Sequence, residues 1–99
     1  MMTIQKFPLA ITGEEIVVGM PSDATILEVE PFSPMSQLQP IVNIWALVND
    51  VLELEARTFR VFSTDDKIPY ELVDPNNADY LGTALLAQGS KEYHVFEVL

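Results

Sequence analysis

The sequence predicts a single small all-β domain, a sandwich or a barrel of about seven short strands. Segments with alternating apolar and polar residues recur along the chain, and turn-forming residues separate them. A chain of 99 residues has room for one domain with one core, spanning residues 1–99. Its apolar content of 48% is too high for a disordered acidic chain, even at a net charge of −10.

The first half of the chain contains four predicted strands. They cover Thr3–Leu9, Ile16–Gly19, Thr25–Glu30 and Ile41–Val48. The last of these is the most apolar segment, and its β-branched residues suit a buried strand. Residues 31–40 include three prolines, which exclude a central strand or a helix interior. We therefore predict an irregular, proline-rich excursion between the third and fourth strands.

The second half contains three further predicted strands, at Thr58–Phe62, Tyr80–Leu86 and Lys91–Val98. Ala87–Ser90 joins the last two as a four-residue loop with a glycine, which is typical of a hairpin. Residues 68–79 contain two prolines and two adjacent asparagines, and we predict a loop with at most one helical turn there. Val51–Arg57 fits both a strand and one face of a helix, so its structure stays open.

The composition excludes several kinds of site. The chain has no cysteine, and therefore no disulfide, no thiolate zinc site and no cysteine nucleophile. Its single histidine, His94, cannot supply a multi-histidine metal site. The sequence also lacks a calcium-loop motif, a glycine-rich phosphate loop and a Gly-x-Ser-x-Gly motif. We predict no metal, no cofactor and no enzymatic activity.

The charge balance limits the partners. Fifteen acidic residues against five basic ones disfavour duplex nucleic acid, because that binding depends on lysine and arginine contacts to phosphates. The first residues do not read as a signal peptide. No apolar stretch approaches the roughly 20 residues needed to span a bilayer. We expect a soluble cytoplasmic protein that makes no membrane contact.

Two of the few basic residues lie close together, at Arg57 and Arg60. On a strand, alternation places Thr58, Arg60 and Phe62 on one face and Arg57 on the other. A face with an arginine, a hydroxyl and an aromatic ring is suited to hold a phosphate and to stack a base. This segment is the strongest candidate for a binding site.

Each candidate residue also has a purely structural interpretation. Arg60 can pair with a carboxylate such as Glu53 or Glu55 across a hairpin. His94 lies among aromatic residues, where a half-buried, hydrogen-bonded histidine is more common than a catalytic one. Trp45 fits the core better than the edge of a pocket, although an indole often keeps one side near polar groups.

Four parts of the sequence resemble an uncharacterised family of small bacteriophage and prophage proteins. They are Ile4–Leu9; Met20-Pro21 with Ala24–Val29; Trp45–Val48 with Arg57–Phe62; and Tyr80–Thr83 with His94–Glu97. Together they span nearly the whole chain. The sequence departs from the family pattern in its longer segment 31–41, in the absence of a glycine from the turn at 63–66, and at Gln5, where an aromatic residue is expected.

The resemblance implies a counter-defence function, because small accessory phage proteins often antagonise host immunity. The specific expectation is a sponge that sequesters a cyclic-nucleotide immune signal, such as a cyclic dinucleotide, in the host cytoplasm. A sponge needs no catalysis and commonly holds its ligand between copies in a homo-oligomer. The residues expected to bind the ligand are Arg57, Thr58, Arg60, Phe62, Trp45, Tyr93 and His94.

The acidic charge suggests a different function. A chain with 15 carboxylates could imitate DNA and occupy the nucleic-acid site of a restriction or CRISPR effector. The acidic residues are spread from Glu14 to Glu97 rather than massed in one run, which is neutral evidence, because folding could still align them. A structural or accessory phage protein is the third possibility.

Overall fold

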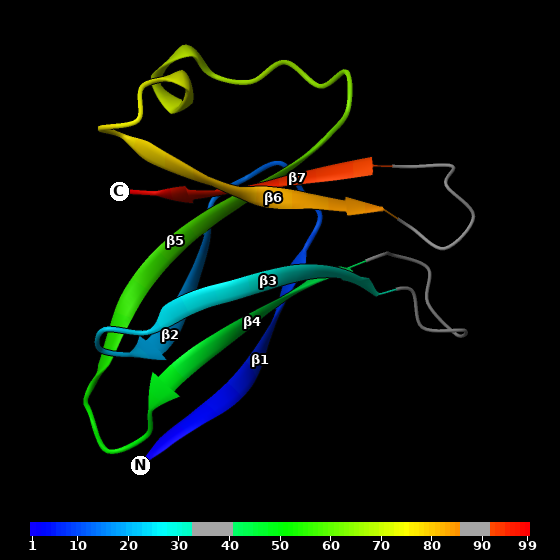
Figure 1. The fold of residues 1–99 in the computed structure, drawn as a ribbon. Helices are drawn as coiled ribbons and strands as arrows, with labels where there is room; N and C mark the ends of the chain where they lie inside the picture. Colours follow the sequence, from blue (N-terminus) through cyan, green and yellow to red (C-terminus); the bar gives the residue numbers. More distant parts are fainter. Residues whose placement is uncertain (33–40, 86–91) are drawn as a thin grey trace.

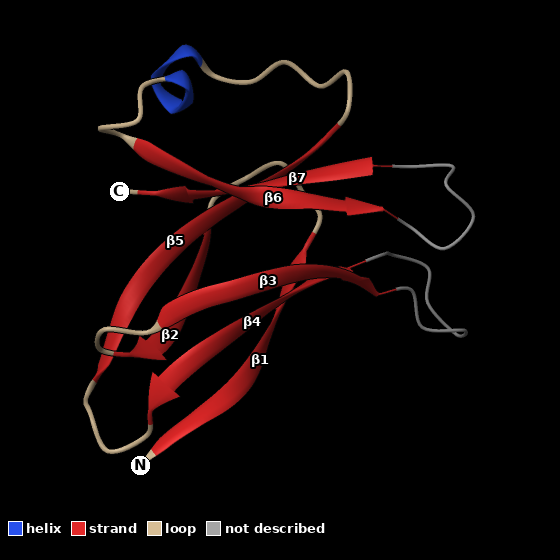
Figure 2. Ribbon diagram, in the orientation of Figure 1, coloured by secondary structure: helices blue, strands red, loops and turns tan. Residues whose placement is uncertain are grey.

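The fold is nearly all β, as predicted. The computed structural model describes residues 1–32, 41–85 and 92–99, which form seven strands and one short 3-10 helix (Figures 1 and 2). In chain order these are β1 (Met2–Ala10), β2 (Ile16–Pro21), β3 (Thr25–Phe32), β4 (Ile41–Asn49), β5 (Leu54–Ser63), η1 (Tyr70–Val73), β6 (Ala78–Leu85) and β7 (Glu92–Val98).

The strands form two antiparallel sheets with one core between them. The three-stranded sheet has the order β1-β4-β3 and the four-stranded sheet has the order β2-β5-β7-β6. Both sheets supply buried side chains to the same cluster: Phe7, Leu9, Met20, Ala24, Val42, Ile44, Ala46, Val48, Phe59, Val61, Ala84, Tyr93 and Val95. The described part of the domain is therefore a sandwich of two sheets.

Strand β4 shows how alternation sets the two sides of a sheet. Ile44 and Ala46 point into the core and are fully buried, whereas Trp45 between them points outward and is only half-buried. The prediction that Trp45 belongs to the core is wrong. Successive side chains on a strand point to opposite sides, so Trp45 cannot share the inner side with its neighbours.

The segment Val51–Arg57, which fitted both a strand and a helix, is a turn before Leu54 and a strand from Leu54 onward. Residues 51–53 form a turn after β4, in which the Leu52 N–H donates to the Asn49 carbonyl at 3.1 Å. Leu54 then begins β5, which pairs with β2 on one side and β7 on the other. From Leu54 onward the segment is therefore extended, because it pairs with strands that are distant in the sequence. Local periodicity carries no information about such pairing.

Residues 64–77 pass over the outer side of the four-stranded sheet (Figure 1). Leu72 of η1 and the nearby Ile68 pack against residues that point outward from this sheet, which are Phe62, Ala78, Phe96 and Val98. The predicted single helical turn within 68–79 is confirmed as η1, although β6 already begins at Ala78. One outer face of the sandwich thus has a second, smaller apolar cluster beneath this segment.

The two sheets come close together where β6 passes β3. Gly82 has φ +149°, and a Cβ at this position would lie 3.0 Å from Val29 Cγ2 of β3. The pairing of β6 with β7 also shifts by one residue between Tyr80 and Gly82. Glycine is suited to this position because it tolerates the backbone angle and leaves room for Val29.

The predicted hairpin of the last two strands is confirmed in its pairing, since β6 and β7 run antiparallel, with Tyr80 opposite Phe96. Its loop at Ala87–Ser90 lies outside the described residues, as do Leu86 and Lys91 at the predicted strand ends. The predicted proline-rich excursion begins later than expected, because Pro31 and Phe32 extend β3 and pair with Val42 and Ile41, which a proline tolerates on an edge strand; residues 33–40 lie outside the described residues.

Candidate functional site

Arg57 and Arg60 lie on opposite faces of β5, as strand alternation predicts. Arg57 is paired in register with Val18 of β2 and points toward the inner side of the sandwich. Arg60 is paired with Phe96 of β7 on the outer side of the four-stranded sheet. The two guanidinium groups therefore have different surroundings and are considered separately.

Arg57 is committed to a bidentate ion pair. Its Nε donates to Glu97 Oε2 at 2.6 Å and its Nη2 donates to Glu97 Oε1 at 2.7 Å. Its Nη1 donates to the Ala24 carbonyl, just before β3, at 2.6 Å. The side chains of Arg57 and Glu97 are only 17% and 9% exposed. This contact ties the end of β7 to the start of β3, and it neutralises the positive charge of Arg57.

The hydrogen bonds that the Arg57 guanidinium donates to the Glu97 carboxylate raise the pKa of Arg57, although burial of the guanidinium acts in the opposite direction. A raised pKa in the folded state stabilises the fold at every pH below the ordinary arginine pKa. That stabilisation is lost only as the pH rises through the raised value. The pair is therefore a structural contact across the whole physiological range.

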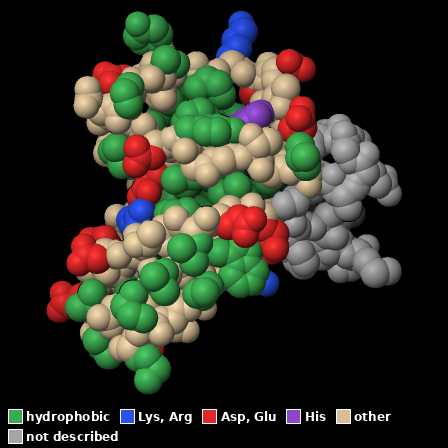
Figure 3. Space-filling model, viewed as in Figure 1, with side chains coloured by type: hydrophobic (Ala, Val, Ile, Leu, Met, Phe, Trp, Pro, Cys, Tyr) green, Lys and Arg blue, Asp and Glu red, His purple; other side chains and the backbone are tan. Residues whose placement is uncertain are grey.

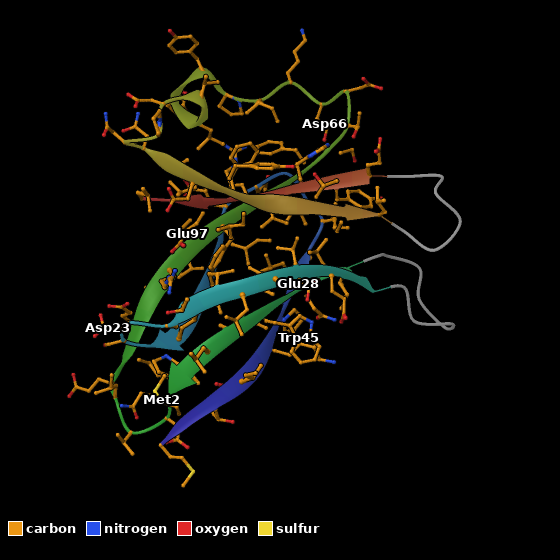
Figure 4. The ribbon with its side chains drawn as sticks, viewed as in Figure 1. Met2, Asp23, Glu28, Trp45, Asp66 and Glu97 are labelled. Atoms are coloured by element: carbon orange, nitrogen blue, oxygen red, sulfur yellow. The ribbon has the colours of Figure 1, made fainter. Side chains whose placement is uncertain are left out.

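A hollow of about 520 Å³ lies beside this ion pair. Its lining residues include three glutamates, Glu15, Glu55 and Glu97, and one basic residue, Arg57. Figure 4 shows Glu97 beside β5 at this side of the sandwich. A cavity with more carboxylates than cations disfavours a phosphate group, so this hollow is not suited to a nucleotide.

Arg60 is held by a backbone carbonyl. Its Nε and Nη2 donate to the Gly13 carbonyl at 3.1 and 2.7 Å, and its Cζ lies 4.8 Å from the centroid of the Phe62 ring. The alternative in which Arg60 pairs with Glu53 or Glu55 is wrong. Glu53 lies in the turn before β5 and Glu55 lies on the same strand as Arg60, so no hairpin brings either carboxylate opposite it.

His94 is half-buried, and both of its ring nitrogens have partners. Nε2 lies 2.8 Å from Thr64 Oγ1, and Nδ1 lies 2.9 Å from the Tyr80 hydroxyl and 3.3 Å from Thr83 Oγ1. Tyr80 and Thr83 also hydrogen-bond each other through their hydroxyl groups. This arrangement agrees with a hydrogen-bonded structural histidine. Within the described residues, no group of three or more histidine, aspartate or glutamate side chains is placed to hold a metal ion.

The structure does not bring the seven predicted site residues into one place. Thr58, Arg60, Phe62 and His94 share the outer side of the four-stranded sheet, although Phe62 is only 4% exposed. Arg57 and Tyr93 point inward, and Tyr93 is 3% exposed within the core. Trp45 lies on the outer side of the other sheet.

Sequence reasoning missed Tyr80. It lies on the same outer side, it is 53% exposed, and its ring centroid lies 5.2 Å from that of Phe96 in an edge-to-face arrangement. The pairing register forms a row across the sheet from Arg60 through Phe96 to Tyr80. The predicted hairpin could have indicated this row only if its register had been known.

The sequence matches a family model over its whole length. Residues 1–99 match DUF7352, a domain of unknown function. The chain belongs to the DUF7352 family. The expectation of an uncharacterised family is thereby confirmed. Comparison with curated proteins and with solved structures gives no significant match for this DUF7352 domain. Among its described residues, no helix is long and apolar enough to cross a membrane.

Proposed function

We propose that this chain is a non-enzymatic binding protein that sequesters a small nucleotide signal of the cyclic-dinucleotide class. In this proposal it is a phage counter-defence protein that acts in the host cytoplasm, and Arg60 holds a phosphate of the ligand. One observation carries the proposal: among the described residues, Arg60 makes no ion pair with a carboxylate, although the chain has 15 acidic residues.

The contacts of Arg60 suit an anion-binding role. A carbonyl oxygen orients the guanidinium but does not cancel its charge, so the charge stays available to a ligand. Because the side chain is already held over Phe62, binding costs less conformational entropy than it would for a mobile arginine. Charge-assisted hydrogen bonds from arginine to phosphate are among the stronger polar contacts. The hydroxyl of Thr58 lies on the same side of β5.

An exposed aromatic ring, that of Tyr80, lies on the same side of the sheet, on its edge strand β6. Tyr80 is two strands away from Arg60, about 10 Å at the usual strand spacing, with its ring half exposed. Bases stack on exposed aromatic rings without strong sequence preference. Arg60 and Tyr80 together offer contacts for the phosphate and the base of one nucleotide.

The net charge of −10 opposes the approach of an anion at long range. Salt screens such repulsion beyond about 8 Å under physiological conditions, so the local contact with Arg60 decides the affinity. The acidic side chains visible in Figure 3 are dispersed among apolar ones. On this face of the molecule they do not merge into one continuous acidic surface of the kind that a DNA mimic needs.

Calorimetric titration with cyclic dinucleotides and with signalling ADP-ribose derivatives tests the proposal. We expect binding of at least one of these ligands by the unaltered chain. Arg60→Ala should weaken that binding by about 10- to 100-fold, the range expected for losing a charge-assisted hydrogen bond. Lys67→Ala removes an exposed cation from the segment 64–77 and serves as the matched control, with unchanged affinity.

Two results would contradict the proposal. If no ligand gives a binding heat, the proposed nucleotide-binding function is wrong. Equal affinity of the Arg60→Ala and unaltered chains removes Arg60 as the site, provided that circular dichroism shows the same fold for both.

A further inference from the structure

The outer side of the three-stranded sheet carries an apolar patch with a charge on either side. We call it the open face and define it by the outward residues Met2, Ile4 and Lys6 of β1, Trp45 and Leu47 of β4, and Glu28 of β3. Met2 and Ile4 are 55% and 58% exposed. Figure 3 shows apolar side chains over this part of the molecule, and Figure 4 shows Met2, Trp45 and Glu28 on the three strands.

The open face differs from an ordinary solvated strand face. Antiparallel sheets that face water usually place polar residues on that side, whereas here Met2, Ile4, Trp45 and Leu47 occupy it. No segment among the described residues packs over these side chains, in contrast to the cover that Leu72 and Ile68 provide on the other sheet. A contiguous exposed apolar patch with a polar rim is typical of an interaction surface.

The charges of the open face lie in one row. The register pairs Lys6 of β1 with Trp45 of β4, and Trp45 with Glu28 of β3. A positive side chain, an aromatic ring and a negative side chain therefore follow one another across the sheet. The Lys6 Nζ lies 5.3 Å from the centroid of the Trp45 ring.

We propose that the open face binds the open face of a second copy of this chain, around a twofold axis parallel to β4. Such an axis exchanges the β1 side of one copy with the β3 side of the other. Lys6 of each copy then faces Glu28 of its partner, and the two Trp45 rings meet at the centre of the interface. A twofold interface requires a surface that complements itself, and this row meets that requirement.

The charge pattern also selects the direction of the axis. A twofold axis perpendicular to the strands would place β1 against β1 and β3 against β3. Lys6 would then face Lys6 and Glu28 would face Glu28, which is repulsive in both places. The axis parallel to β4 gives two attractive pairs instead, so like charges disfavour the alternative docking.

The neighbouring row fits the same arrangement. Ile4, Leu47 and Thr25 are paired in register across the three strands. Near the same axis, Leu47 lies toward Leu47 of the other copy, and Ile4 lies toward the Thr25 methyl group. Three strands spaced about 4.8 Å apart make a narrow face, so the interface is small and we expect a Kd in the micromolar range.

Sedimentation equilibrium and tryptophan fluorescence over a concentration series test this proposal. Trp45 is the only tryptophan, so its emission reports directly on the centre of the interface. We expect a monomer–dimer equilibrium and a blue shift of the emission as concentration rises. Lys6→Glu and Glu28→Lys should each raise the dimer Kd by about tenfold or more, because each places like charges face to face.

Mixing the two charge variants gives the sharpest result. Lys6→Glu carries two negative charges in the row and Glu28→Lys carries two positive ones, so a 1:1 mixture should form a heterodimer although each variant alone stays monomeric. Val17→Glu is the matched control, because Val17 is 64% exposed but lies on β2 of the other sheet. It should dimerise as the unaltered chain does.

Three results would overturn the inference. One is a chain that stays monomeric up to millimolar concentration. Another is a dimer that persists unchanged in Lys6→Glu and in Glu28→Lys. The third is a failure of the mixed variants to associate although the unaltered chain dimerises. The inference is independent of the nucleotide proposal, since it concerns residues of the three-stranded sheet only.

Discussion

The outer faces of the two sheets differ in what covers them. Both faces carry apolar side chains at alternate positions, but the segment 64–77 returns over the four-stranded sheet, and Leu72 packs there against Phe62. On the three-stranded sheet, Ile4 and Trp45 have no such cover among the described residues, and Ile4 remains 58% exposed. Similar strand patterns thus give a second small core on one side and exposed apolar side chains on the other. The predictions below test that difference.

The largest effect is expected from removing the ring at the centre of the covered face. Phe62→Ala should lower the free energy of unfolding by about 3 to 5 kcal/mol, because it leaves a cavity beneath η1 and removes the contact with Phe96. Trp45→Ala removes a larger ring from the other face and should cost no more than about 1 kcal/mol in the monomer. Urea denaturation of both variants measures this contrast, and equal losses would contradict it.

An intermediate effect is expected from the inner side of β5. Arg57→Ala leaves the Glu97 carboxylate without its cation in a site where that side chain is 9% exposed, and should cost about 2 to 4 kcal/mol. Because the pKa of Arg57 is raised, the stabilisation that its charge provides should be constant from neutral pH up to the ordinary arginine range.

The matched variant for Arg57→Ala is Arg60→Ala on the outer side of the same strand. It removes hydrogen bonds to one carbonyl and should cost about 1 kcal/mol. Thermal unfolding of the two variants at neutral pH shows which of the two arginines contributes more to the stability of the fold. A greater loss for Arg60→Ala would show that the Arg57–Glu97 contact contributes less than its geometry suggests.

The smallest effect on stability is expected on the open face. Ile4→Thr keeps a β-branched residue on β1 and changes a side chain that is already 58% exposed, so the free energy of unfolding should change by less than about 0.5 kcal/mol. The same variant should weaken dimer formation, because it removes apolar surface from the interface. If chemical denaturation at low concentration instead shows that Ile4→Thr destabilises the monomer, Ile4 contributes to the packing of the monomer itself.

The candidate site could be predicted from the sequence only in part. Strand alternation correctly placed Arg57 and Arg60 on opposite faces of β5. It could not identify Glu97 as the partner of Arg57, because the two residues are 40 positions apart and meet only when β5 and β7 pair. Tyr80 was missed for the same reason, since its place beside Arg60 depends on the register of three strands.

The sequence by itself determined most of the strand content and the alternation of side chains along each strand, because these depend on local composition and backbone geometry. It also excluded cysteine chemistry and multi-histidine metal sites, because the residues are not present. Only the tertiary structure decided which side of each strand is buried, and Trp45 illustrates this. Alternation separates it from Ile44 and Ala46, but it does not say which of the two sides faces the other sheet. That choice depends on how the two sheets pack against each other, which brings together residues that are far apart in the sequence.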